Sequence, residues 1–195
     1  MREDERFAEA IRRIDEANGE DPRTELVDGA PHPRELLFAR RVYDWVRKLV
    51  AQPSEELLLA ARAHTLRRWM IPRDRYPMTT PGYHQWRDAL AAFHADQVEC
   101  VLQEVGYPPQ TIDRVKALII RQDWRNDPEG RVLEDADCLV FLETKLEGYL
   151  DEWEEKKTVN ILKKTLRKMT PAGKEHAAGL RLSPRCAELL RRAES

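Results

Sequence analysis

The segment most suited to binding or catalysis contains a histidine followed closely by several arginines. His64 ends an apolar run, and Arg67, Arg68 and Arg73 follow it. An imidazole changes charge near neutral pH, and a guanidinium is a planar fork of donors that matches phosphate or carboxylate oxygens. The segment therefore predicts an anion-binding pocket that contains an acid–base group. The alternative is that these arginines pair with the plentiful Asp and Glu residues of neighbouring helices, as most surface charges do.

A second set of candidates shares one face of a later helix. His84, Arg87, Ala91 and His94 are separated by steps of 3, 4 and 3 residues, and the 3.6-residue helical period places them along one side. His84 and Arg87 are therefore candidates for ligand binding. The alternative for His84 is that it is a satisfied polar residue, as a lone histidine usually is.

Two carboxylates lie inside an apolar helix further along the chain. Asp135 and Asp137 are followed at once by the run Cys138-Leu139-Val140-Phe141. Because burying an unpaired charge is costly, each carboxylate needs an arginine, another cation or a metal. The alternative for Asp135 is a simple salt bridge with Arg67 or Arg68.

Helices must position these residues. Apolar residues recur at helical spacing, and Asn-Gly, Pro and Gly positions mark where each run begins or ends. The predicted helices cover residues 7–18, 33–50, 54–64, 83–105, 109–119 and 131–150, and helical pattern continues through residues 161–166. Thr170-Pro171 and Ser183-Pro184 each resemble an N-cap followed by a first-turn proline. Residues 20–32 and 71–82 are predicted loops, and no strand-like alternation is present, so the fold class is all-α.

The composition limits the classes of function. The formal net charge of −2 provides no global basic field for nucleic acid or an anionic membrane, so any phosphate binding must be local. The cysteines are few, widely spaced and without a CxxC motif, which predicts buried structural thiols in a reducing compartment: Cys100, Cys138 and Cys186. No apolar signal region and no run of about 18 apolar residues is present, so we expect a cytoplasmic protein without membrane contact.

The order of three segments resembles the HD-domain superfamily of helical, metal-dependent phosphohydrolases. These segments are the apolar helix that ends in His64, the stretch from His94-Ala95 through residues 101–108, and residues 133–139. The likeness covers about residues 35–143. It implies an HD-like helical core at about residues 33–150, followed by a C-terminal helical extension at about 151–195 in one domain. In this comparison His64 matches the histidine of the His-Asp pair, Asp137 the late aspartate, and His94 one of the additional histidines.

The sequence departs from the superfamily at several metal-ligand positions. Phe38 stands where the first histidine belongs, Thr65 replaces the aspartate of the pair, and Arg121-Gln122 stand where another histidine is expected. Phe and Thr cannot replace an imidazole and a carboxylate as strong ligands of a divalent transition metal. The resemblance therefore implies a degenerate site that holds at most one divalent metal ion, with these candidate ligands: His64, His94, Asp135 and Asp137.

A second resemblance covers nearly the whole chain. The spacing His-x-x-Arg-Arg-Trp from His64, followed by Ile-Pro-Arg-x-x-Tyr-Pro from Ile71, is long and specific. Together with residues 7–18, 82–87 and 133–143, it is similar to the domain of unknown function 4202 family (DUF4202). This resemblance indicates ancestry and brings no established activity.

Two functions follow from these residues. The first is a hydrolase that acts on a phosphate-bearing small molecule or nucleotide, with His64 and His94 as acid–base groups and Asp137 orienting them. The alternative is a non-catalytic ligand-binding or regulatory domain for an anionic small molecule. In this alternative Trp69 or Tyr76 would stack on a base. The predicted ligand-binding residues are Arg67, Arg68, Trp69, Arg73, Tyr76, His84 and Arg87.

A third and weaker hypothesis concerns nucleic acid. Basic residues recur in the C-terminal helices, at Lys156, Lys157, Lys163, Lys164, Arg167, Lys168 and Lys174. Glutamates lie just upstream, and alternating charges usually coat a solvated helix. We therefore expect no nucleic-acid partner.

Overall fold

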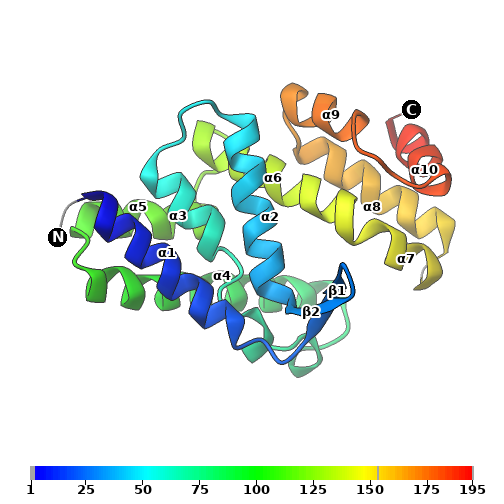
Figure 1. Cartoon of the computed structure of the whole chain (residues 1–195). Coiled ribbons are helices and arrows are strands. Elements are labelled where there is room, and N and C mark those ends of the chain that lie inside the picture. Colours follow the sequence, from blue (N-terminus) through cyan, green and yellow to red (C-terminus); the bar gives the residue numbers. More distant parts are fainter. Residues whose placement is uncertain (1–2, 153, 195) are drawn as a thin grey trace.

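The computed structural model describes residues 3–152 and 154–194 and is built almost entirely of helices (Figure 1). The longer elements of the first part are α1 (Glu3–Gly19), α2 (Arg34–Leu49), α3 (Glu55–Ala63), α4 (Thr80–Val105), α5 (Pro109–Ile119) and α6 (Pro128–Thr144). Two short 3₁₀ turns, η1 (Arg68–Met70) and η2 (Arg73–Arg75), lie between α3 and α4. The C-terminal part holds α7 (Leu146–Glu152), α8 (Glu155–Lys168), α9 (Pro171–Ala178) and α10 (Pro184–Glu194). The all-α prediction is confirmed.

Local sequence signals set several helix boundaries. The side chains of Ser54, Thr79, Asp127 and Thr170 accept hydrogen bonds from backbone N–H groups at the starts of α3, α4, α6 and α9. At its other end α4 stops at Gly106, which has a φ of 85°. A left-handed residue ends a helix with little strain only when it lacks a Cβ atom, so glycine suits this position.

The core forms where α2 and α3 meet α5 and α6. α2 packs along α6 and α3, and α5 packs on α3 and α4. The run from Leu59 to Ala63 in α3 is fully buried or nearly so, as the sequence predicts for a central helix. Helices α8, α9 and α10 gather at one end of the molecule, away from α4 and α5 (Figure 1). The residues that follow α3 contact both α4 and α6: His64 meets Asp137 of α6, and the carbonyl oxygen of Leu66 meets His94 of α4.

Three sequence predictions need correction. Residues 24–33, predicted as loop, form an antiparallel hairpin of β1 (Thr24–Val27) and β2 (Ala30–Pro33). Its turn is Asp28-Gly29, both residues with positive φ, a hairpin signal that the sequence does contain. The predicted helix 131–150 is two helices, α6 and α7, which separate at Lys145. Cys100 is exposed rather than buried.

The other two cysteines match the prediction. Cys138 and Cys186 are buried, and burial raises the pKa of both thiols. Because the thiolate is the reactive form, these are inert structural residues. Within residues 3–152 and 154–194, no helix has both the length and the apolarity needed to cross a membrane.

Candidate functional site

His64 and Asp137, 73 residues apart in the sequence, meet at the edge of the core. His64 is the C-cap residue of α3, and Asp137 projects from α6. Nε2 of His64 lies 3.3 Å from Oδ1 of Asp137, and Nδ1 lies 3.2 Å from the carbonyl oxygen of Ala61. Phe38 of α2 packs beside the imidazole, with ring centroids 5.8 Å apart. The structure therefore brings two of the predicted site residues together and engages both nitrogens of the histidine.

Arg121 joins this pair and is a residue that the sequence reasoning missed. It follows α5 in a left-handed conformation with a φ of 60°, which is uncommon for a residue with a side chain. Its guanidinium contacts Oδ2 of Asp137 at 3.0 Å and Oε2 of Glu134 at 2.9 Å. Lys168 of α8 contacts the other oxygen of Glu134 at 3.1 Å. The signal was present, because buried carboxylates in an apolar helix need cations.

The charges around Asp137 keep it ionised. Burial by itself raises the pKa of Asp137, but the hydrogen bond from His64 and the positive charge of Arg121 outweigh this effect. The pKa of Asp137 therefore lies well below its ordinary value. Burial likewise lowers the pKa of Arg121, but the carboxylates of Asp137 and Glu134 raise it above the ordinary value. This cluster is a permanently charged network at neutral pH.

Arg68 and Arg87 supply further positive charge without a carboxylate of their own. Across residues 3–152 and 154–194, no Asp or Glu oxygen lies within 4 Å of either guanidinium. Arg68 stacks on Trp86, with Cζ 4.8 Å from the ring centroid, and Arg87 reaches the hydroxyl of Tyr83 at 3.5 Å. Burial lowers the pKa of Arg68, and the charge of Arg87 adds to that effect, whereas the more distant carboxylates of Glu35 and Asp137 act in the opposite direction. The protein thus keeps a poorly hydrated cation next to another cation.

His94 lies deep beside these cations. It is 3% exposed, and its Nδ1 is 2.7 Å from the carbonyl oxygen of Leu66. Burial lowers the pKa of His94 to about 3, and the charges of Arg68, His64 and Arg87 contribute to this shift. The ring is therefore neutral at physiological pH, with its hydrogen on Nδ1 because only a donor can bond to a carbonyl. Nε2 consequently carries a lone pair, and it has no partner among the described atoms.

Two predicted arginines have other tasks. Arg67 has a φ of 54°, and its guanidinium extends toward Gln97 and Glu20, at 3.2 Å and 3.0 Å. Arg73 donates to the carbonyl oxygens of Tyr76 and Pro77, at 2.9 Å and 2.8 Å, and so holds the loop before α4 in place. Arg67 therefore forms a surface ion pair, which was the alternative considered from the sequence. Arg73 instead stabilises the loop before α4 through its hydrogen bonds to the backbone.

The residues predicted to stack on a base, Trp69 and Tyr76, and the predicted ligand-binding residue His84 all lie at or near the protein surface. Trp69 and Tyr76 are partly buried in the segment between α3 and α4. His84 is exposed on the first turns of α4, with its ring centroid 5.8 Å from that of Tyr83. The structure thus places His84 outside the buried group formed by His64, His94 and Arg68.

Asp135 faces away from the predicted site. Its carboxylate accepts hydrogen bonds from the backbone N–H of Thr170, at 2.8 Å, and from the Thr170 hydroxyl. Thr170 in turn caps α9 by accepting from the N–H of Gly173 at 3.0 Å. The alternative of a salt bridge with Arg67 or Arg68 is wrong for this residue. Asp135 instead anchors α9 on α6.

The contact between Asp135 and Gly173 leads to a stability prediction. A Cβ atom on Gly173 would lie 2.5 Å from Cγ of Asp135, closer than real Cβ contacts. We expect Gly173→Ala to displace the carboxylate and lower the free energy of unfolding by about 2 kcal/mol, within the usual range for overpacking. Gly148→Ala in α7 is the matched control, because nothing lies within 4 Å of its added Cβ atom. That change should stabilise the protein slightly. Urea denaturation measures both, and equal effects at the two glycines would contradict the expected clash.

Of the side chains predicted to hold a metal, only His64 and Asp137 meet, and they do so as a hydrogen-bonded pair. In the described part of the chain, no group of three or more His, Cys, Asp or Glu side chains has an arrangement suited to a metal ion. Asp135 is bound to Thr170, and Asp137 to Arg121. Phe38 occupies the space beside His64, and the buried Thr65 hydroxyl offers no charge. These residues do not fit the metal site that the HD resemblance implies, and we derive no chemical step through a metal.

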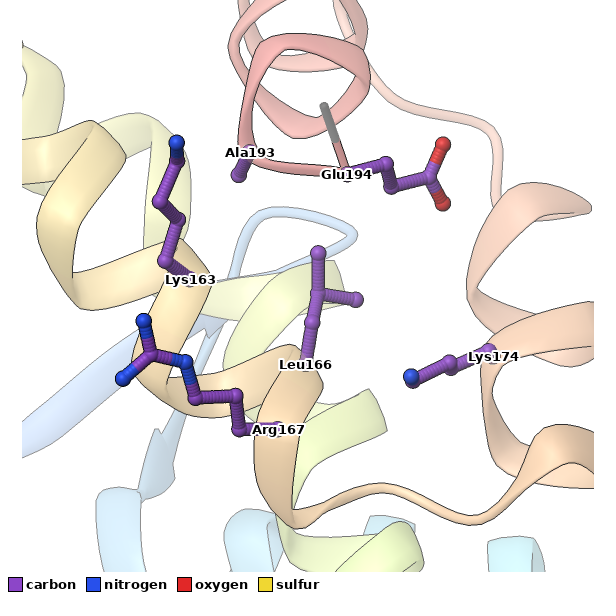
Figure 2. A pocket seen from close by; sticks show the side chains of 6 residues that line it. All are labelled: Lys163, Leu166, Arg167, Lys174, Ala193 and Glu194. Carbon is purple, nitrogen blue, oxygen red and sulfur yellow. The ribbon is translucent and has the colours of Figure 1, made fainter.

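A separate hollow lies among the C-terminal helices. It has a volume of about 480 Å³ and is lined by Lys163, Leu166, Arg167, Lys174, Ala193 and Glu194 (Figure 2). Leu166 points into the space between α8 and α10, and Lys174 extends into it from α9 (Figure 2). These helices carry the basic residues noted in the sequence. None of the hollow's lining residues belongs to the group around His64.

The fold and the charged group define an all-α protein with a partly buried cluster of arginines and histidines near α3, α4 and α6. The family model described as domain of unknown function (DUF4202) matches residues 8–190. The chain belongs to this family, as the sequence resemblance predicts. No match was found among the curated proteins or among the solved structures.

Proposed function

We propose that the protein binds a phosphate-bearing small molecule, such as a nucleotide, at a cationic site formed by Arg68 and Arg87. The observation that carries this proposal is the state of Arg68, which is poorly hydrated, stacked on Trp86 and without a carboxylate within 4 Å among the residues described. Burying part of a charge without a counter-charge in direct contact is unfavourable. An anionic ligand supplies the missing charge and the hydrogen-bond acceptors.

The chemistry of the surrounding side chains supports a phosphate. Trp86 covers one face of the Arg68 guanidinium, which leaves its in-plane N–H groups available to a ligand. Arg87 adds a second guanidinium, and a phosphate has enough oxygens to accept from both. The Asp137 carboxylate is already neutralised by Arg121 and His64, so it does not cancel this field.

Exposed apolar side chains near Arg68 and Arg87 favour a ligand whose organic part is flat or apolar. Met70 and Tyr83 are large side chains that remain about half exposed, at 49% and 42%. Met70 lies two residues after Arg68, and the Tyr83 hydroxyl contacts Arg87. Trp69 is partly buried between these segments. Aromatic rings next to bound phosphate are suited to stacking on a base.

Hydrolysis is a second candidate, favoured by the hydrogen bond between His64 and Asp137 and by the HD resemblance of the segments that carry them. A carboxylate that orients an imidazole is a common acid–base arrangement. In this structure, however, Nε2 of His64 faces Asp137 and Nδ1 faces the Ala61 carbonyl, so neither nitrogen is free. His94 does not take up a second proton at neutral pH, because burial lowers its pKa to about 3. This geometry supports binding more strongly than catalysis.

A ligand screen separates the two functions. Protein purified without chelator is heated with inorganic phosphate, nucleoside monophosphates and nucleoside triphosphates, and each nucleotide is then analysed by chromatography. Binding predicts a higher melting temperature with a nucleotide recovered intact. A new product would instead assign hydrolysis, and metal analysis of the same sample tests whether one divalent ion accompanies the protein. Unchanged melting with every phosphate compound would overturn the proposal.

A further inference from the structure

The unpartnered Nε2 atom of His94 is a buried acceptor close enough to Arg68 and Arg87 to be affected by their charges. Its Nδ1–H is used by the Leu66 carbonyl, so Nε2 can only accept. Leu66 lies between His64 and Arg68 in the chain, and Arg87 lies two helical turns before His94 on the same face of α4. Buried polar atoms are nearly always hydrogen-bonded, and each exception requires an explanation. Among the described side chains none supplies a hydrogen to this atom.

We infer that the ligand bound by Arg68 and Arg87 presents an alcohol hydroxyl group, which donates a hydrogen bond to Nε2 of His94. This inference rests on the proposed function and specifies the substrate class, a hydroxylated phosphate ester such as a nucleotide or a sugar phosphate. The arginines bind the phosphate, and His94 recognises the hydroxyl.

The charges near His94 exclude other donors. An ammonium group would be repelled by Arg68 and Arg87, because no carboxylate lies within 4 Å of either in the described chain. A protonated phosphate oxygen is also disfavoured, since neighbouring cations stabilise the fully ionised phosphate. A carbonyl oxygen cannot donate, and it would meet the lone pair of Nε2. A neutral hydroxyl group satisfies the nitrogen at the lowest electrostatic cost.

The substitution His94→Asn removes the acceptor Nε2 and keeps a donor for the Leu66 carbonyl. The amide nitrogen of asparagine takes the place of Nδ1 and can still donate to Leu66, whereas nothing replaces the lone pair of Nε2. His176→Asn is the matched control, because His176 is an exposed residue of α9 outside this cluster. Calorimetry with the full chain compares AMP with 2′-deoxy-AMP and 3′-deoxy-AMP, glycerol 3-phosphate with propyl phosphate, and includes inorganic phosphate.

In the original protein, the hydroxylated member of at least one matched pair should bind about tenfold more tightly, as expected for one net hydrogen bond. His94→Asn should reduce this preference to less than twofold and leave the affinity for inorganic phosphate within twofold. The control should behave as the original protein. Melting of the ligand-free variants shows whether His94→Asn folds. His94→Gln, whose longer amide can place an oxygen near Nε2, provides a second variant if it does not.

Three results would overturn the inference while leaving phosphate binding intact. The first is equal binding of hydroxylated and deoxy ligands by the original protein. The second is a preference for hydroxylated ligands that persists in His94→Asn, which would show that Nε2 does not recognise the hydroxyl group and bonds a buried water instead. The third is tighter binding of inorganic phosphate at pH 6 than at pH 8 that disappears in His94→Asn, which would assign the hydrogen to the phosphate. Absence of binding by every phosphate compound would overturn the proposed function, and the inference with it.

Discussion

Replacing Arg68 by methionine is expected to remove phosphate binding and at the same time to stabilise the ligand-free protein. The guanidinium is poorly hydrated and has no carboxylate within 4 Å among the described residues, so its charge opposes folding. Methionine can pack on Trp86 in its place, although the cation–π contact of about 0.5–1 kcal/mol is lost. We expect a net gain of about 1 kcal/mol in the free energy of unfolding. Binding should weaken on the order of 100-fold, since hydrogen bonds to charged groups contribute about 1.5–3 kcal/mol each.

Arg67→Met is the control for this prediction. Both arginines are predicted ligand-binding residues in the sequence, but the structure directs Arg67 toward Glu20 and Gln97. We expect this change to alter phosphate affinity less than threefold, because an exposed ion pair contributes only about 0–1 kcal/mol. Calorimetry and urea denaturation measure both quantities. Loss of stability in Arg68→Met with unchanged phosphate affinity would show that Arg68 is structural.

Replacing Arg121 by methionine is expected to have the opposite effect on stability. The guanidinium pairs with Asp137 and with Glu134, whose side chain is only 2% exposed. Removing it leaves two carboxylates at the core edge, with His64 and Lys168 as their remaining partners. Breaking a buried pair by removing one partner typically costs 3–5 kcal/mol. Because Arg121 is itself partly exposed, we expect a loss of about 3 kcal/mol, at the lower end of that range.

Arg114→Met is the matched control for Arg121. Arg114 also bridges two carboxylates, those of Asp127 and Glu129, but at a more exposed position. Its replacement should cost about 1 kcal/mol, as for exposed pairs. Equal losses in the two variants, measured by urea denaturation, would show that the Arg121 cluster is no more dependent on its cation than a surface pair.

The stability loss in Arg121→Met should also depend on pH. Asp137 has a folded-state pKa below its ordinary value of 3.8, so its contribution to stability is present above about pH 4 and is lost as the pH falls. In the variant the carboxylates lack their cation, and protonation relieves the unpaired charge. The difference in unfolding free energy between the original protein and Arg121→Met should therefore shrink between pH 7 and pH 4. A difference that stays constant over that range would argue against an electrostatic origin.

The helices could be predicted because their signals are local. The N-cap residues, the first-turn prolines and Gly106 act within a few positions of the chain, and the apolar spacing of α2 and α5 sets their buried faces. The hairpin was missed although Asp28-Gly29 is a hairpin turn signal, because both strands are short and β2 contains two prolines, Pro31 and Pro33. The break at Lys145 between α6 and α7 has no proline or glycine to mark it.

By itself the sequence determined the all-α class and the family, because these follow from periodicity and from a long specific motif. The meeting of His64 with Asp137 was expected from the HD resemblance alone. Only the tertiary structure decided the direction of each charged side chain. It separated Arg68 from Arg67, assigned Asp135 to the cap of α9, and brought Arg121 to Asp137. The physical reason is that a charged side chain is directed by the counter-charges and hydrogen-bond partners it meets, and those partners come from distant parts of the chain.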